Sequence, residues 1–186
     1  MALEVAAEKR LFSRAEYHRM GEVGILKPTD RVELIRGEIV KKWPVSRRHI
    51  AFVNNLNQLL VTRLAGRAIV SVQNPVVLSN DTEPEPDLAV LRPRSYKHAE
   101  PAVADALLLI EVAETSLRYD RVTKRPLYAE AGMPEYWVVD CGAETVEVHR
   151  APTGSGYRDL TVVAGAGSLS LLAFPDVSLA LAEIFS

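Results

Sequence analysis

The chain has 186 residues, of which 48% are hydrophobic and 25% charged, as is typical of one globular domain with a sizeable core. Its formal net charge of −2 argues against a protein that coats nucleic acid without specificity. No apolar run approaches the roughly 18 residues of a membrane span, and the N-terminus lacks a signal peptide's apolar stretch. We therefore expect no membrane partner and a cytoplasmic location. The single cysteine, Cys141, excludes an intramolecular disulfide and a cysteine-cluster metal site.

The first ten residues show no apolar periodicity, which predicts a loose lead-in (1–10) before a single domain (11–186). Ser13 and Glu16 have the spacing of a capping box, in which each side chain satisfies a free backbone donor of the other residue. This spacing predicts a short helix that ends near Met20.

Two features predict the next elements. Residues 31–35 and 38–42 alternate between apolar and polar around Gly37, which predicts a β-hairpin. Ser46 then has the position of an N-cap for the longest helix, over residues 47–64, with Gly66 placed to end it. The apolar stripe of this helix predicts the face that packs on a sheet: Ile50, Val53, Leu56, Leu60 and Leu64.

After short strands predicted over 69–73 and 76–78, two apolar strands carry the first candidate site residues. One begins at Asp87, because the prolines before it cannot pair in a central ladder. The other, Leu107 to Val112, has the composition of a strand buried on both faces. Glu111 in that strand therefore needs a partner or a cation.

The connection between these strands, roughly residues 93–105, places Asp87 opposite Glu111 if the two strands form an antiparallel hairpin. Directly opposed side chains lie on one face, with Cβ atoms about 4.5–5.5 Å apart. Two carboxylates at that separation raise each other's pKa unless a divalent cation lies between them. The strand pair therefore predicts an acidic pair on one face of the sheet.

A third element, over residues 117–131, has helical spacing and places Asp120, Lys124 and Tyr128 on one face. Lys124 is then the cation nearest the predicted acidic pair. Pro126 lies inside this element and predicts a bend or a late helix start.

Strands are predicted after this helix over 136–140, 145–149 and 157–163, with a closing helical turn over 179–185. A strand core with helices on its faces predicts a single α/β domain.

The chain resembles the putative restriction endonuclease (Uma) family of the PD-(D/E)xK nuclease-like superfamily. The resemblance spans about Phe12 to Phe185. The matching motifs are Glu33 to Val40, Ser46-x-x-His49, Pro86-Asp87, Glu111-Val112, Asp120-x-x-x-Lys124-x-x-x-Tyr128 and Gly132 to Asp140.

This resemblance implies a restriction-endonuclease-like mixed β-sheet flanked by helices, with an N-terminal β-hairpin. It also implies Mg²⁺-dependent cleavage of DNA, with Mn²⁺ as a substitute for Mg²⁺. A homodimer is expected by analogy with nucleases, since two cuts in a duplex require two sites.

The predicted metal ligands are the carboxylates of Asp87 and Glu111 and the backbone carbonyl of Val112, which are hard oxygen ligands suited to Mg²⁺. The superfamily signature has Glu-x-Lys, but this chain has Ala113 in place of the lysine. The resemblance suggests that Lys124 supplies the missing ammonium from the neighbouring helix, where it would orient the attacking water.

Additional candidates have two interpretations each. His49 either caps its helix or faces the acidic site. Glu38 is either an exposed hairpin residue or a third acid, and Glu33 is the weaker candidate for that acid. Gln73 either lines the cleft or ends a strand, while Tyr128 either contacts a phosphate or packs.

Three functions fit these residues. The first is a Mg²⁺-dependent endodeoxyribonuclease with Asp87, Glu111 and Lys124 as catalytic residues. The second is a non-catalytic module on the same fold that binds nucleic acid or a protein. In the third, these residues form only an internal ion network in a structural dimer.

Overall fold

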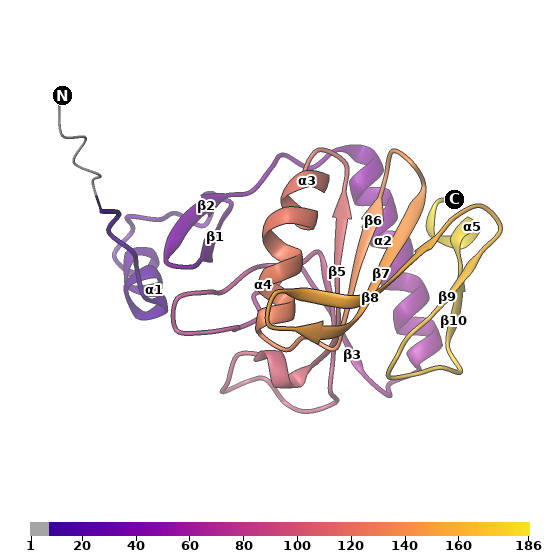
Figure 1. Cartoon of the computed structure of the whole chain (residues 1–186). Helices are drawn as coiled ribbons and strands as arrows, with labels where there is room; N and C mark the ends of the chain where they lie inside the picture. Colours follow the sequence, from indigo (N-terminus) through magenta and orange to yellow (C-terminus); the bar gives the residue numbers. More distant parts are fainter. Residues whose placement is uncertain (1–7) are drawn as a thin grey trace, which may run out of the picture.

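A six-stranded mixed sheet forms the centre of the computed structural model, which describes residues 8–186 (Figure 1). Most of the predicted lead-in, residues 1–7, lies outside the described residues. The strands, in spatial order, are β3 (Ile69–Val72), β4 (Leu88–Leu91), β5 (Ala106–Ala113), β6 (Glu135–Asp140), β7 (Thr145–Thr153) and β8 (Gly156–Val163). The β5–β6 pair is parallel and the other neighbouring pairs are antiparallel. The predicted α/β fold with a mixed sheet is confirmed.

Helices cover both faces of the sheet (Figure 1). α2 (Arg47–Leu64) packs on the face to which β5 contributes Leu108 and Ile110. The opposite face, to which β5 contributes Leu109, is covered by three consecutive helical segments. They are α3 (Leu117–Tyr119), the π-helical turn η2 (Asp120–Lys124) and α4 (Arg125–Glu130). None of the described helices is both long and apolar enough to cross a membrane.

The long helix has the predicted bounds because its end residues satisfy the free backbone groups. The Ser46 hydroxyl accepts a hydrogen bond from the His49 N–H, and Ala65 and Gly66 adopt left-handed φ angles at the other end. The predicted apolar stripe was wrong at Ile50, which is 46% exposed. The other predicted residues of the stripe, Val53, Leu56, Leu60 and Leu64, are buried, and Phe52 is buried beside them.

The N-terminal part lies beside the sheet and contains a capped helix and a hairpin (Figure 1). α1 (Arg14–Glu22) starts with the predicted capping box and extends slightly beyond the predicted end. β1 (Val32–Ile35) and β2 (Glu38–Lys41) form the predicted hairpin. Gly37 is required at its turn, because φ is +76° and an added Cβ would lie 2.7 Å from the Cβ of Leu11.

The β4–β5 register is the one predicted from the sequence. Leu88 pairs with Ile110, so Asp87 and Glu111 are the next opposed residues along the ladder. Other parts of the fold were predicted less accurately. Residues 76–78 do not form a strand, and Val77 makes only an isolated bridge to Ala102. The structure also contains elements that were not predicted: η1 (Val103–Asp105), β9 (Ser168–Ser170) and β10 (Ser178–Ala180), the last leading into the expected helical turn α5 (Leu181–Ile184).

The sequence predicted a bend or a late helix start at Pro126. The structure has a π-helical turn just before this proline, and α4 begins after that turn. The Arg125 N–H donates to the carbonyl of Asp120, five residues back, instead of the usual four. A widened turn of this kind places its side chains differently from those of a regular α-helix and is frequent at functional sites. Lys124 is the last residue of this turn.

Candidate active site

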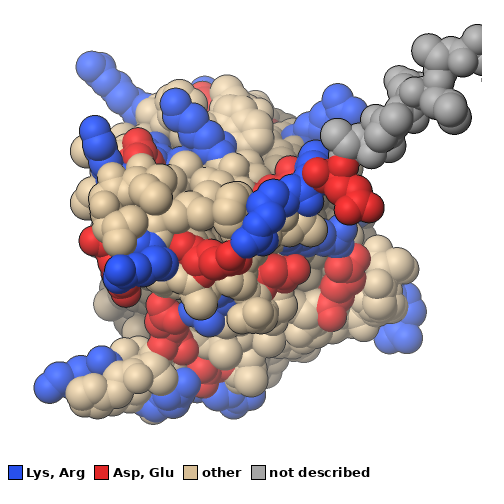
Figure 2. All heavy atoms as spheres, turned by 90° about the vertical axis from the view of Figure 1, so that its left-hand side faces the viewer, with Lys and Arg blue, Asp and Glu red and all other residues tan. Residues whose placement is uncertain are grey.

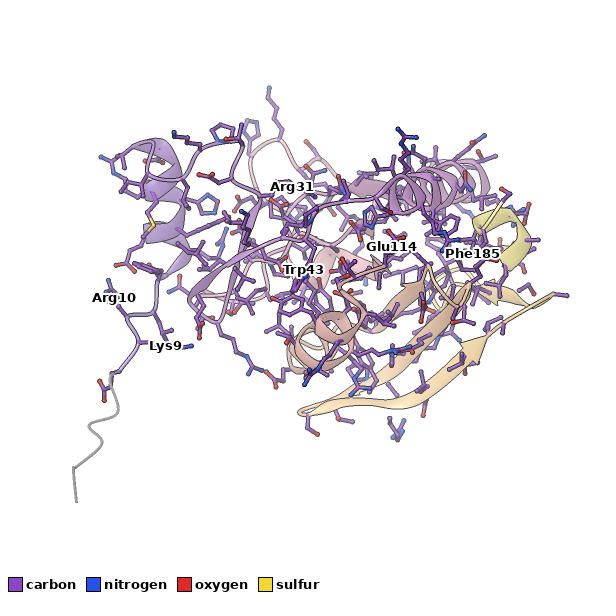
Figure 3. All side chains as sticks on the ribbon, turned by 90° about the horizontal axis from the view of Figure 1, so that it is seen from above. Lys9, Arg10, Arg31, Trp43, Glu114 and Phe185 are labelled. Atoms are coloured by element: carbon purple, nitrogen blue, oxygen red, sulfur yellow. The ribbon has the colours of Figure 1, made fainter. Side chains whose placement is uncertain are left out.

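A cleft lies at the carboxyl end of β5, where α2, the π-helical turn and the hairpin meet. It contains about 50 Å³ of space, enough for a few water molecules. Arg31, Trp43 and Glu114 line it, and Figure 3 shows them close together between the N-terminal part and the sheet. Its buried polar lining consists of Glu33, His49, Asp87, Glu111, Asp120 and Lys124, each less than 10% exposed.

Asp87 is held at the start of β4 by three neighbours. Its Oδ2 accepts a hydrogen bond of 2.9 Å from the Val112 N–H. Its Oδ1 accepts one of 3.3 Å from Gln73 Nε2 and lies 3.2 Å from His49 Nε2. Burial raises the pKa of Asp87, but His49 and the Val112 N–H outweigh this effect and hold the pKa below its usual value. Asp87 is therefore ionised in the folded protein.

Glu111 has fewer partners. Its Oε1 accepts hydrogen bonds of 2.8 Å from Lys124 Nζ and 2.8 Å from the Tyr128 hydroxyl. Its Oε2 accepts no hydrogen bond from the described residues. Burial raises the pKa of Glu111 to about 8, although Lys124 opposes the shift. This carboxylate can therefore accept another cationic partner.

Lys124 links two acids from different parts of the chain. Its Nζ lies 2.8 Å from Glu111 Oε1 and 3.1 Å from Glu33 Oε2. Burial lowers the pKa of Lys124, but the nearby carboxylates outweigh this effect and raise the pKa well above its usual value. Asp120, held by a 2.7 Å hydrogen bond from Ser116, has a pKa raised to about 6, mainly by burial. The cleft thus contains four buried acids, and the buried groups that can carry positive charge beside them are the ammonium of Lys124 and the imidazole of His49.

His49 enters from the first turn of α2. Its Nδ1 donates a 2.8 Å hydrogen bond to the Val112 carbonyl, the atom predicted as a metal ligand. Its Nε2 is buried and has no partner with hydrogen-bond geometry among the described residues, although Asp87 Oδ1 is near. Burial lowers the pKa of His49, but Asp87 and the Val112 carbonyl outweigh it and raise the pKa. His49 thus lies between two predicted ligands.

The other predicted candidates differ in position. Glu38 is outside the cleft: its side chain is half exposed and pairs with Lys9 at 3.0 Å. Glu33, which the sequence ranked lower, occupies the cleft, so that ranking was wrong. Gln73 is exposed and does not line the cleft, although its side chain donates a hydrogen bond to Asp87. Tyr128 is fully buried behind Glu111 and does not line the cleft.

The donor set of the cleft fits a hard divalent cation. Asp87 and Glu111 offer carboxylate oxygens, and the Val112 carbonyl can accept a second partner besides His49. Mg²⁺ usually binds one or two protein carboxylates and retains several waters, which suits this small set. A bound cation would also favour the ionised form of Glu111, whose pKa burial raises to about 8.

A second acidic cluster lies elsewhere. Among residues 8–186, the single group of three His, Cys, Asp or Glu ligand atoms within 4.8 Å of one another is His18, Glu83 and Glu100. The Arg14 guanidinium pairs with both of these glutamates. Because two of its three residues, His18 and Glu100, are exposed and both glutamates pair with Arg14, this cluster is a weaker candidate than the buried acids of the cleft.

Comparisons with known proteins agree with this fold. The structure is similar to the crystal structure of a putative nuclease from Anabaena variabilis assigned to DUF820, with a TM-score of 0.74 and 19% identity. The similarity covers 94% of this chain and 97% of that chain. None of the curated proteins matches the chain. The family Uma2, described as "putative restriction endonuclease", matches residues 14–182. Because this match covers most of the sequence, the chain belongs to the Uma2 family of putative restriction endonucleases.

Proposed function

We propose that this protein is a Mg²⁺-dependent endodeoxyribonuclease, with Mn²⁺ as a possible substitute ion. The observation that carries the proposal is the excess of buried carboxylates over ammonium groups in an open cleft at the end of β5. A purely structural site would satisfy each of these carboxyl groups, because a buried polar group without a partner is costly, and Oε2 of Glu111 accepts no hydrogen bond from the described residues. Membership of the Uma2 family supports DNA as the substrate.

The metal would be held by Asp87, Glu111 and the carbonyl of Val112. When bound, Mg²⁺ supplies positive charge near phosphoryl oxygens and lowers the pKa of a water molecule. The residues around it position these groups. Tyr128 fixes one oxygen of Glu111, while His49 fixes the carbonyl of Val112.

Lys124 provides the ammonium that the sheet itself lacks. It is 2.8 Å from Glu111, so its Nζ lies beside a predicted metal ligand. From there, it can orient an attacking water by hydrogen bonding and stabilise negative charge that develops on the phosphate in the transition state. Glu33, at 3.1 Å, holds this ammonium from the side of the hairpin.

One observation favours a different function, a non-catalytic module that binds nucleic acid or a protein. The close ion pair between Glu111 and Lys124, closed on one side by Tyr128, is also compatible with a purely structural role. Asp87 lines the same cleft as this pair, however. This convergence supports the nuclease over the binding module.

Plasmid nicking in Mg²⁺ or Mn²⁺ tests the proposal. We expect wild-type protein to nick supercoiled DNA and Asp87→Ala to lose this activity. Glu38→Gln is the matched control, because it removes an acid that lies outside the cleft, and it should nick like the wild type. Wild-type protein that fails to nick with either ion would contradict the nuclease and favour the binding module.

We further propose a homodimer, by analogy with nucleases that cut two strands with two sites. Analytical ultracentrifugation with and without a duplex oligonucleotide tests this state. A monomer under both conditions would contradict it.

A further inference from the structure

A second groove adjoins the candidate active site. It has a volume of about 470 Å³ and lies between the hairpin and the segment that leads into α2. Several residues line both the groove and the cleft, so the two form a continuous surface: Arg31, Lys42, Trp43, Pro44 and Val45. Trp43 and Val45 are exposed by 41% and 38%. An apolar groove that opens directly from a cleft for phosphate chemistry is suited to the less polar part of the same substrate.

Trp43 is supported as a stacking surface. Its ring packs against that of Tyr119, with centroids 5.0 Å apart and planes tilted by 48°. Tyr119 is itself held by a 3.4 Å hydrogen bond from its hydroxyl to Glu33. A partly exposed indole fixed from one side is the arrangement on which proteins stack nucleobases.

Two cations next to Trp43 remain available for phosphate groups. Arg31 and Lys41 line the groove, are exposed and form no ion pair with any carboxylate among the described residues. Arg31 Nη1 makes only a 3.4 Å contact with the Trp43 carbonyl, and Figure 3 shows the two residues side by side. Lys42 is different, since its Nζ is bound to Glu85 at 3.1 Å.

The surrounding surface does not provide a broad basic patch. Figure 2 shows basic and acidic side chains interspersed over the face formed by the N-terminal part. A duplex held mainly through its phosphates requires many aligned cations. The groove instead combines a local stacking surface with three basic residues and one acidic residue, Asp30. A stacking surface with a few cations is the combination used for single strands.

We infer that the substrate of this cleft is DNA with an unpaired nucleotide, whose base stacks on Trp43 while Arg31 and Lys41 hold the adjoining phosphates. This inference rests on the proposed nuclease function and specifies its substrate class. In a continuous duplex both faces of each base are covered by neighbouring bases, so no face is free for Trp43. A single strand, a gap or a loop exposes such a face.

Tryptophan fluorescence with EDTA present tests this inference without cleavage. The chain has two tryptophans, and Trp137 is fully buried, so quenching by DNA reports on Trp43. We expect a twelve-nucleotide oligo(dT) to quench the emission and to bind at least about tenfold more tightly than a blunt duplex of two complementary twelve-nucleotide strands, which has no loop. Fluorescence anisotropy of the labelled oligo(dT) then extends the comparison to variants that lack the tryptophan.

The variants separate stacking from charge. Trp43→Ala should weaken oligo(dT) binding about tenfold, whereas Trp43→Phe, which keeps an aromatic face, should stay within about threefold. Arg31→Ala should weaken binding and reduce its salt dependence by about one phosphate contact. Lys97→Ala is the matched control, since Lys97 is exposed but does not line the groove, and it should bind like the wild type.

Three results would overturn the inference: equal affinity for oligo(dT) and duplex, unchanged binding by Trp43→Ala, or emission that depends on protein concentration but not on DNA. The last result would indicate that a second copy of the chain covers the groove. Nicking in Mg²⁺ is measured separately. Tight, Trp43-dependent binding without nicking would reject the nuclease and keep the stacking site. Nicking with no preference for unpaired over duplex DNA would keep the nuclease and reject the stacking site.

Discussion

Glu135 and Glu111 are both buried glutamates on neighbouring strands of the sheet, but their surroundings differ. Glu135 accepts hydrogen bonds from both Nε and Nη2 of Arg150, from the Trp137 indole and from the Leu172 N–H. Glu111 has two donors, both on one oxygen, and it faces an open cleft that contains other acids. Its pKa is raised to about 8, with burial as the main cause.

The difference separates a structural acid from a functional one. A buried carboxylate whose oxygens are all satisfied stabilises the fold, and its removal leaves several donors without partners. A buried carboxylate with a free oxygen and acidic neighbours is maintained at a cost in stability, which is common where a ligand or metal completes the site. The predictions below test this distinction.

Replacement of Glu111 should give the largest effect on activity. We expect Glu111→Gln to reduce the nicking rate by about 1,000-fold or more. Its free energy of unfolding in urea should change by less than about 1 kcal/mol, because Lys124 keeps Glu33 as a partner. A large loss of stability would instead place Glu111 in the same structural class as Glu135.

Replacement of Glu135 should lower the stability of the fold and leave the nicking rate nearly unchanged. We expect Glu135→Gln to lower the free energy of unfolding by about 3 kcal/mol, because Arg150 loses its buried charged partner. The nicking rate of the folded protein should remain within about twofold of the wild type. Glu38→Gln, an exposed control, should change the stability by less than about 0.5 kcal/mol. If Glu135→Gln were as stable as the control, Glu135 would not be the structural acid that the comparison with Glu111 requires.

Metal binding should stabilise the fold through the cleft alone. With Mg²⁺ at about ten times its dissociation constant, the free energy of unfolding should rise by about 1.4 kcal/mol in the wild type and in Glu135→Gln. Asp87→Asn should show no such increase. Equal stabilisation of Asp87→Asn would place the metal at another site.

The smallest expected effect concerns the hydroxyl that holds Glu111. Tyr128→Phe removes a 2.8 Å hydrogen bond to Oε1 and should cost about 1 kcal/mol of stability. The nicking rate should fall about tenfold because Glu111 is less well fixed. An unchanged nicking rate would show that Tyr128 only packs in the core and does not position Glu111.

Local sequence signals predicted much of the fold because they act over short distances. Ser46 and Gly66 defined the long helix through its end groups, and Gly37 defined the hairpin turn. The β4–β5 register followed from the position of the connection between the two strands. The isolated bridge of Val77 depends on a distant residue, Ala102, and was not predicted. The short β9–β10 pair was not predicted either, although its strands are close in the sequence.

The site was harder to predict where tertiary packing overrides a local pattern. Alternation along the hairpin gave no reason to prefer Glu33, since strict alternation exposes one face of a strand. In the structure three successive residues of β1, including Glu33, are buried, because β1 lies between β2 and Glu83, to which Leu34 forms a bridge. Trp43 appeared in the sequence only as the residue that ends a strand, and its position beside the cleft depends on tertiary structure.

Isothermal titration of Mg²⁺ and Mn²⁺ into wild type, Glu111→Gln and Glu38→Gln tests the central distinction most directly. The account predicts one site per chain in the wild type and in Glu38→Gln, and at least a tenfold loss of affinity in Glu111→Gln. Wild-type protein that binds neither ion, or Glu111→Gln that binds as tightly as the wild type, would contradict it.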